Sequence, residues 1–159
     1  MAESNIERLI AAWRNTGRSI YHVHHQSQSP QGLFRPGSFG GTAKPEAAPR
    51  PGEPLIHKKV NSAFIGTDLD QRLRSASIQT LVIVGFTTDH CVSTTARMAG
   101  NLGFDTYLVS DATATFERIG PSGVHFDAQV MHDTALASLH QEFANVVQTQ
   151  SVLDAVLGA

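Results

Sequence analysis

The pattern of apolar and polar residues predicts a strand followed by a helix near the middle of the chain. Residues 81–84 form an unbroken aliphatic run that ends at Gly85, as is typical of a strand buried on both faces of a parallel sheet. Polar residues that favour a helix start follow at 87–89, and apolar residues then recur at helical spacing until Gly103. Cys91 therefore falls in the first turn of the predicted helix, just beyond the carboxyl end of the strand.

Strand and helix patterns alternate along the rest of the chain as well. Strands are predicted over residues 19–24, 55–58, 104–109 and 145–147. Helices are predicted over residues 4–16, 67–73, 123–142 and 152–157. An exit loop is predicted over residues 111–115. This alternation predicts an α/β fold, a three-layer α/β/α sandwich with a mainly parallel sheet and right-handed crossovers.

Residues 26–54 form a long irregular stretch that holds six of the seven prolines. Inside a compact domain such a stretch is more often a functional lid or a contact loop than a linker. Phe34 and Arg35 are candidates to close over a pocket, where Arg35 would pair with a carboxylate of the substrate. In the alternative interpretation, these side chains pack against a neighbouring subunit.

Composition narrows the classes of protein to which the chain can belong. Its 159 residues are most simply one domain over residues 1–159. With 12 basic and 14 acidic side chains the net charge is -2, and no basic patch predicts a nucleic-acid partner. A single cysteine cannot form an internal disulfide, which fits a reducing cytoplasm. The sequence shows neither a signal-peptide pattern nor an apolar run of membrane-spanning length, so we expect a cytoplasmic protein without a membrane partner.

The position of Cys91 allows two interpretations. The unpaired amides and partial positive charge of a helix start favour a thiolate over a thiol, and the same amides can stabilise an oxyanion formed during attack on a carbonyl. Ligands of open α/β sheets bind outside the carboxyl ends of the strands, where Cys91 is predicted to lie. Alternatively, Cys91 is a small buried apolar residue, as many lone cysteines are.

Two segments resemble the motifs of a known family. Residues 85–97, Gly-Phe-Thr-Thr-Asp-His-Cys-Val-Ser-Thr-Thr-Ala-Arg, with Gly-Phe at 103–104 and Asp-Ala-Thr at 111–113, resemble the nucleophile segment of the isochorismatase-like cysteine hydrolases. That superfamily includes nicotinamidases and N-carbamoylsarcosine amidohydrolases. Residues 58–69 are similar to the lysine motif of the family, in which the catalytic lysine stands six residues before a phenylalanine. This lysine corresponds to Lys58.

The resemblance implies a mechanism and a set of site residues. Cys91 would attack an amide-type carbonyl of a small molecule and form a thioester that water then hydrolyses, with Lys58 as the second catalytic residue. Backbone amides of Thr87 and Cys91 would form the oxyanion hole, and the peptide bond between Phe86 and Thr87 would be cis. The resemblance implies no cofactor and favours a homo-oligomer, a dimer or larger. An isochorismate-type vinyl ether hydrolase is a weaker alternative, because that branch typically replaces the cysteine.

One part of the family pattern is absent near the start of the sequence. In the family, a central strand precedes the first helix and carries the aspartate that acts as general base, whereas no such segment precedes Ser4. Either the sequence begins late, or the chain is an N-terminally short form that lacks the base. We favour the first interpretation, because a lost central strand leaves buried backbone groups unpaired on two neighbours. Under the second, the chain is an inactive binding or oligomerisation subunit.

Three histidines lie in and beside the strand predicted at residues 19–24. His22 and His24 would project to the same face, which invites a metal site, but the Asp-x-His pattern of the metal-binding nicotinamidases is absent. We therefore expect no metal, and histidines that line the mouth of a pocket or form local hydrogen bonds. His25, at the carboxyl end of the strand, is the best candidate for contact with the substrate.

Overall fold

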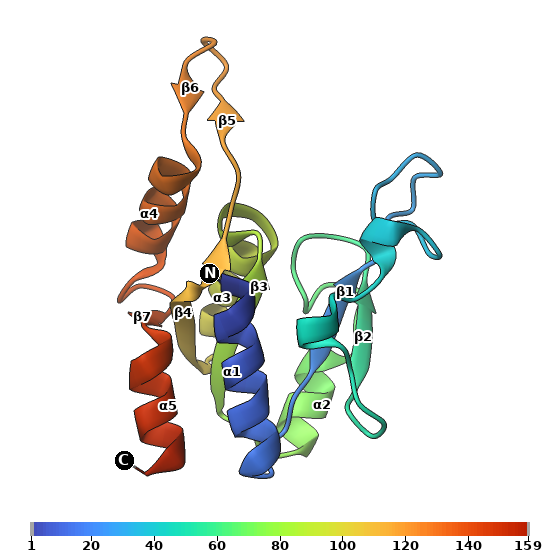
Figure 1. Ribbon diagram of the computed structural model, residues 1–159, viewed down its shortest axis with the longest axis vertical. Helices are drawn as coiled ribbons and strands as arrows, with labels where there is room; N and C mark the ends of the chain where they lie inside the picture. The colour runs from blue at the N-terminus through green and yellow to red at the C-terminus, as the bar shows by residue number, and fades with distance from the viewer. Residues whose placement is uncertain (1, 159) are drawn as a thin grey trace.

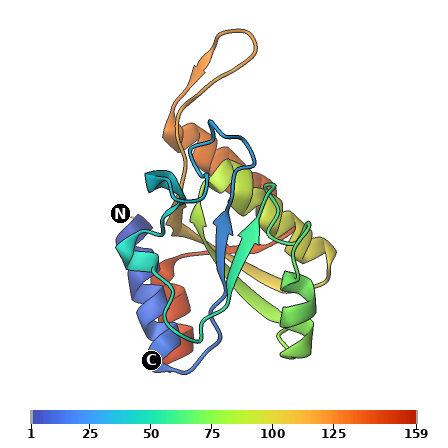
Figure 2. The ribbon, with the colours of Figure 1, turned by 90° about the vertical axis from the view of Figure 1, so that its right-hand side faces the viewer.

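Two parallel sheets form the middle layer of the computed structural model, which describes residues 2–158. In one sheet, β1 (His22–His25) pairs with β2 (Leu55–Lys58). In the other, β3 (Thr80–Phe86), β4 (Asp105–Ala114) and β7 (Asn145–Val147) are parallel, with β4 in the centre. Figure 2 shows the carboxyl ends of β1, β2 and β3 at the same end of the molecule.

Helices cover both faces of this layer (Figure 1). α1 (Ala2–Asn15) and α5 (Thr149–Leu157) pack on one face, where they share an apolar cluster with β4. α2 (Leu69–Ser75), α3 (Ser93–Asn101) and α4 (Ala128–Leu139) cover the other face. The prediction of a three-layer α/β/α sandwich with a mainly parallel sheet is therefore confirmed. Across residues 2–158, no helix combines the length and the apolar character needed to cross a membrane.

Apolar patterning explains how the layers pack. Ile6 and Leu9 are nearly one helical turn apart in α1 and are 6% and 3% exposed, because both face the cluster shared with β4. Leu108 and Val109 are consecutive in β4, so they point to opposite faces of the sheet, and both are fully buried. Burial of consecutive strand residues requires helices on both faces, as in other parallel sheets.

The end of β4 differs from its prediction. The strand continues to Ala114, so residues 111–115 are mostly strand and not an exit loop. The register between β3 and β4 shifts between Ile83 and Gly85, after which Phe86 pairs with Ala114. Because this irregularity lets β4 follow β3 to its carboxyl end, the strand is longer than its apolar run indicates.

The helix predicted over residues 123–142 begins only at Ala128 and ends at Leu139. Asp127 caps this helix by accepting a hydrogen bond from the backbone N–H of Val130 at 2.8 Å. The residues before the cap belong to an antiparallel hairpin of β5 (Arg118–Ile119) and β6 (His125–Phe126). Gly123, at φ 80°, lies in the turn of this hairpin, where a left-handed backbone favours glycine.

The stretch of residues 26–54 leaves β1 and returns at β2. Its regular structure consists of two short 3₁₀ helices, η1 (Phe39–Gly41) and η2 (Pro45–Ala47). Ser38 caps η1 by accepting a hydrogen bond from the N–H of Gly41. The stretch begins at the carboxyl end of β1, so its first residues lie at the edge of the sheet where ligands bind in α/β folds.

A cavity of about 950 Å³ lies between the two sheets. Among residues 2–158, β1 pairs only with β2 and β3 pairs only with β4, so β1 and β3 each have one edge without a strand partner. The walls of the cavity are mainly apolar and include Ile10 of α1, Val23 of β1 and Ile83 of β3. The cavity also reaches Lys58 and Cys91, near the carboxyl ends of the strands.

Candidate active site

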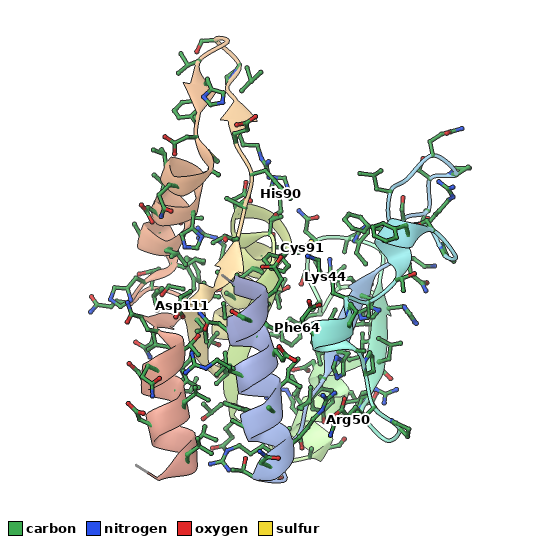
Figure 3. The ribbon with its side chains drawn as sticks, in the orientation of Figure 1. Lys44, Arg50, Phe64, His90, Cys91 and Asp111 are labelled. Carbon is green, nitrogen blue, oxygen red and sulfur yellow. The ribbon has the colours of Figure 1, made fainter. Side chains whose placement is uncertain are left out.

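Cys91 lies in a tight turn that directly follows β3. Residues Thr88–Val92 form η3, a single π-helical turn, and α3 continues from Ser93. The thiol side chain is partly exposed and makes a long contact of 3.9 Å with the Asn61 carbonyl oxygen Oδ1. Figure 3 shows Cys91 next to His90 in this turn, near the carboxyl end of β3. The sequence predicted an α-helical first turn here, and the structure gives a π turn instead.

Lys58 is the last residue of β2, and its ammonium group contacts the thiol. Its Nζ donates hydrogen bonds to Cys91 Sγ at 3.1 Å and to the carbonyl oxygen of Val60 at 2.9 Å. The side chain is buried, whereas the adjacent Lys59 is exposed. None of the ion pairs found within residues 2–158 includes Lys58. A thiolate at Cys91 would therefore be the nearest anion to a buried ammonium group.

His25 completes a small cluster of polar groups at the carboxyl ends of β1 and β2. In the parallel register His25 stands opposite Lys58, and its Nδ1 lies 3.4 Å from Lys58 Nζ. Burial lowers the pKa of His25, and the positive charge of Lys58 lowers it further. The imidazole is thus neutral at pH 7, and its Nδ1 can accept a hydrogen bond from the lysine.

The two predicted loop residues are placed differently. The Phe34 ring packs edge-on against the His25 ring, with 5.8 Å between the ring centroids. The Arg35 guanidinium has no hydrogen bond or ion pair within residues 2–158 and is exposed. The structure thus brings Phe34 to the His25–Lys58 cluster and leaves Arg35 without a contact there.

The other two histidines take part in local contacts. His22 is buried and lies 2.7 Å from Glu53 Oε2 through its Nε2. The His24 ring lies edge-on to the His57 ring, with 6.3 Å between the ring centroids. Burial lowers the pKa of His24, and the nearby His22 and His57 lower it further. Within residues 2–158, no group of three or more His, Cys, Asp or Glu side chains is arranged to hold a metal ion.

The backbone at Thr87 joins β3 to the turn that carries Cys91. The peptide bond between Phe86 and Thr87 is cis. The Thr87 carbonyl accepts hydrogen bonds from the N–H groups of His90 and Val92, each at 3.2 Å. None of the backbone hydrogen bonds found outside the helices and strands of residues 2–158 uses the Thr87 N–H. This N–H is therefore available to a ligand.

Side chains that the sequence did not single out hold the turn that carries Cys91. Thr88 is fully buried, and its Oγ1 contacts Thr113 Oγ1 at 3.1 Å and His132 Nδ1 at 2.9 Å. Asp89 accepts a hydrogen bond from Thr115 and forms an ion pair with Arg118 at 3.1 Å. The run of polar residues at 87–89 indicated the start of a helix. The residues that contact Thr88 and Asp89 lie far along the chain, and no local pattern indicated them.

Asp111 is a carboxylate near the end of a strand, where a general base could lie, but its contacts are structural. Its Oδ1 accepts hydrogen bonds from the N–H and Oγ1 of Thr149, both at 2.8 Å, at the start of α5. Its Oδ2 accepts a third from Asn5 Nδ2 at 3.0 Å. The carboxylate thus joins α1, β4 and α5 on the face of the sheet away from α3.

Comparisons with known proteins identify the family. Residues 2–151 match the family model described as the isochorismatase domain. The chain is 45% identical over 153 residues to the isochorismatase family protein YrdC of Bacillus subtilis. This match covers 96% of this chain and 82% of the relative. A crystal structure of an isochorismatase family protein from Chromobacterium violaceum superposes with a TM-score of 0.96 at 40% identity, covering 99% of this chain and 82% of that chain.

A shorter match connects the chain with a named amidohydrolase. The ureidoacrylate amidohydrolase RutB of Agrobacterium fabrum is 34% identical over 89 residues, which are 56% of this chain and 38% of the relative. Together with the family model and the longer matches, this similarity gives one assignment. The chain belongs to the isochorismatase family of hydrolases.

Proposed function

We propose that the chain is a cysteine hydrolase that cleaves a C–N amide-type bond of a small molecule through a thioester on Cys91. The observation that carries the proposal is the 3.1 Å contact between Lys58 Nζ and Cys91 Sγ. An ammonium group held this close to a thiol favours the thiolate, which is the nucleophilic form. The similarity to a ureidoacrylate amidohydrolase supports an amide-type substrate.

The reaction takes two steps in this proposal. The Cys91 thiolate adds to the carbonyl carbon, a C–S bond forms, and the carbonyl electron pair moves to an oxyanion. The N–H groups of Thr87 and Cys91 donate hydrogen bonds to that oxyanion. When the oxyanion collapses, the C–N bond breaks, and the nitrogen takes from the general base the proton that the thiol had given up and leaves as ammonia or an amine. Water then attacks the thioester, and the carboxylic acid and the thiolate are released.

Lys58 and His25 have different roles in this scheme. Lys58 stabilises the negative charge on sulfur, because its Nζ makes its shortest polar contacts with Cys91 Sγ and the Val60 carbonyl oxygen. His25 stays neutral, so it adds no second positive charge beside Lys58. Phe34, in contact with His25, forms an apolar wall for the substrate. Arg35 is exposed and makes no contact with this cluster, so its pairing with a substrate carboxylate stays a prediction.

The proton transfers need a base, and the cavity between the sheets has room for a segment that could supply it. An extended segment between β1 and β3 would pair with the free edge of each strand and end near Lys58 and Cys91. We propose that such a segment carries the aspartate that the family resemblance implies. The crystal structure that superposes on 99% of this chain has further residues, since the match covers 82% of it.

Amide cleavage with thioester trapping tests the proposal. A panel of small aliphatic and aromatic amides is offered to the chain and to the same chain extended upstream in its reading frame. We expect cleavage by the extended chain, an acyl mass on the peptide that holds Cys91 after acid quench, and no cleavage by Cys91→Ala. Cleavage that persists in Cys91→Ala, or no cleavage and no acyl adduct in either form, would overturn the mechanism.

A further inference from the structure

A β-hairpin arm extends from the carboxyl end of the sheet. The arm, defined as residues 115–127, holds β5 and β6, and these two short strands pair only with each other within residues 2–158. Figures 1 and 2 show it standing clear of the rest of the molecule beyond α4. An isolated two-stranded hairpin is only marginally stable in water. The arm therefore lacks the packing that normally keeps a hairpin of this size ordered.

The arm exposes apolar side chains along its length. Phe116 is 68% exposed, Ile119 76%, Val124 52% and Phe126 39%. Single exposed apolar residues are common on protein surfaces, but four of them on one short projecting element mark an interaction surface. Because Ile119 pairs with His125 and Phe126 pairs with Arg118, Ile119 and Phe126 lie on opposite faces of the hairpin, so both faces carry apolar side chains. Aromatic residues are also enriched in the cores of protein interfaces.

A second exposed apolar surface lies in the loop of residues 26–54. This loop patch consists of Leu33, Phe34 and Phe39, which are 79%, 48% and 100% exposed. The loop follows the carboxyl end of β1, and the arm follows the carboxyl end of β4. Because the carboxyl ends of the strands lie at one end of the molecule, the arm and the loop patch both lie at that end (Figure 2).

We propose that the arm and the loop patch are the two halves of an interface with a second copy of this chain. The arm of each copy packs on the loop patch of the other, which is the reciprocal contact that a two-fold axis generates. Each copy contributes one face of its arm together with its loop patch. With roughly 150–250 Å² for a phenylalanine, this contribution is on the order of several hundred Å², the scale of one side of a standard interface.

Charges beside the two surfaces fit the same partner. Glu117 of the arm is exposed, with only a 3.4 Å contact to His125 on the opposite strand. Arg35 of the loop patch region has no ion pair within residues 2–158. Opposite charges at the rim of an interface steer association and fix its register. In the proposed dimer, Glu117 of each copy lies at the rim near Arg35 of the other.

The interface would also cover the candidate active site. Phe34 of the loop patch contacts His25, which contacts Lys58. An arm seated on this patch therefore forms part of the wall around the substrate of the other copy. At its base, the arm is tied to the nucleophile turn of its own copy by the ion pair between Arg118 and Asp89. The dimer thus links both sites through the two arms.

Sedimentation velocity on three variants tests the interface, independently of any activity. Ile119→Asp replaces the most exposed apolar side chain of the arm, on one face of the hairpin, and Phe39→Asp replaces the fully exposed ring of the loop patch. Leu157→Asp is the matched control, since Leu157 is 58% exposed and ends α5 at the opposite end of the molecule (Figure 1). We expect wild type and Leu157→Asp to have twice the chain mass of 17.1 kDa, and the other two variants to have the mass of one chain.

Three results would overturn the proposed interface. Wild type that sediments as a single chain at about 100 μM excludes a dimer of useful affinity. A dimer that survives Ile119→Asp does not use the arm, and one that survives Phe39→Asp does not use the loop patch. Circular dichroism of each variant verifies its fold. If a charged variant fails to fold, the milder changes Ile119→Ser and Phe39→Ser replace it, and each must weaken the dimer relative to wild type.

Discussion

At the scale of single residues, the site depends on three side chains at the ends of three strands. Lys58 ends β2, His25 ends β1, and Cys91 follows β3 by five residues. Within β2, Ile56 and Lys58 are buried whereas Leu55 and His57 are exposed, since consecutive residues of a strand point to opposite faces. This alternation, and not the lysine itself, places an ammonium group 3.1 Å from the thiol.

His25 predicts how stability depends on pH. Because its pKa is lowered in the folded chain, the unfolded chain binds a proton first as the pH falls. Unfolding free energy, measured by urea titration, should therefore fall as the pH drops from about 7 to about 5. His25→Gln should reduce this slope, although His24 contributes in the same direction.

An unchanged slope in His25→Gln would contradict the placement of this imidazole beside a buried ammonium group. The same outcome in His24→Gln as well would show that neither histidine is neutral in the folded chain near pH 6.

At the scale of elements, one carboxylate joins three segments around the smaller sheet. Glu53 accepts hydrogen bonds from Arg14 Nε at 2.7 Å, from the N–H of Arg50 at 2.8 Å, and it contacts His22 Nε2 at 2.7 Å. These contacts hold α1, β1 and the end of the 26–54 loop together. Since the free edge of β1 has no strand partner within residues 2–158, this network anchors the smaller sheet to the rest of the fold.

Replacement of Glu53 should destabilise the fold in a pH-dependent way. The hydrogen bond from Arg14 is the main reason that the pKa of Glu53 lies well below its usual range. A carboxylate with a depressed pKa stabilises the fold above its unfolded value and loses this effect as the pH falls toward the folded value. Glu53→Gln should therefore lower the free energy of unfolding by about 1–3 kcal/mol at pH 7, and the difference from wild type should shrink in acid.

Urea unfolding at pH 7 and in acid measures this effect. Glu142→Gln is the control, because Glu142 is exposed and takes part in none of the ion pairs of residues 2–158. Equal stabilities of Glu53→Gln and wild type at pH 7 would show that the network does not anchor β1.

Strong local patterns predicted most elements of the fold. The aliphatic run at 81–84 and the strand at 55–58 required no information from distant residues. The hairpin of the arm was missed because each of its strands has only two residues, and Val124 also fits the helical period of α4. The end of β4 was missed because its pairing with β3 depends on a register shift that no sequence period encodes.

The candidate site was predictable only in part. The turn at Cys91 and the ends of the strands follow from sequence, whereas Lys58 was chosen over Lys59 by resemblance alone. The contacts of Asp89 with Arg118 and of Thr88 with His132 join segments 29 and 44 residues apart. Such pairs depend on tertiary packing, so local patterns could not indicate them.

At the scale of the whole molecule, two features lack a packing partner within residues 2–158: the cavity between the sheets, and the apolar surfaces of the arm and the loop patch. The cavity has free strand edges, which fit an extended segment. The arm and loop patch expose large apolar side chains, and the strands of the arm are only two residues long. These surfaces therefore fit the surface of a folded partner better than an added strand. The two features therefore call for different experiments.

Dimer formation should make thermal stability depend on concentration. A partner that binds only the folded chain stabilises it by mass action, so the Tm of wild type should rise with protein concentration. The Tm of Ile119→Asp should stay constant over the same range, and that of Leu157→Asp should follow wild type. A concentration-independent Tm in wild type would argue against a dimer, and differential scanning fluorimetry is sufficient to measure it.

The central claim is that Lys58 holds Cys91 as a reactive thiolate, and the rate of iodoacetamide labelling tests it most directly. Intact-mass measurements at pH 7 compare wild type with Lys58→Met and with Lys59→Met, a matched change at the exposed neighbour. We predict labelling faster than that of a free cysteine in wild type and Lys59→Met, and labelling at least about tenfold slower in Lys58→Met. Equal rates in all three proteins would contradict the claim.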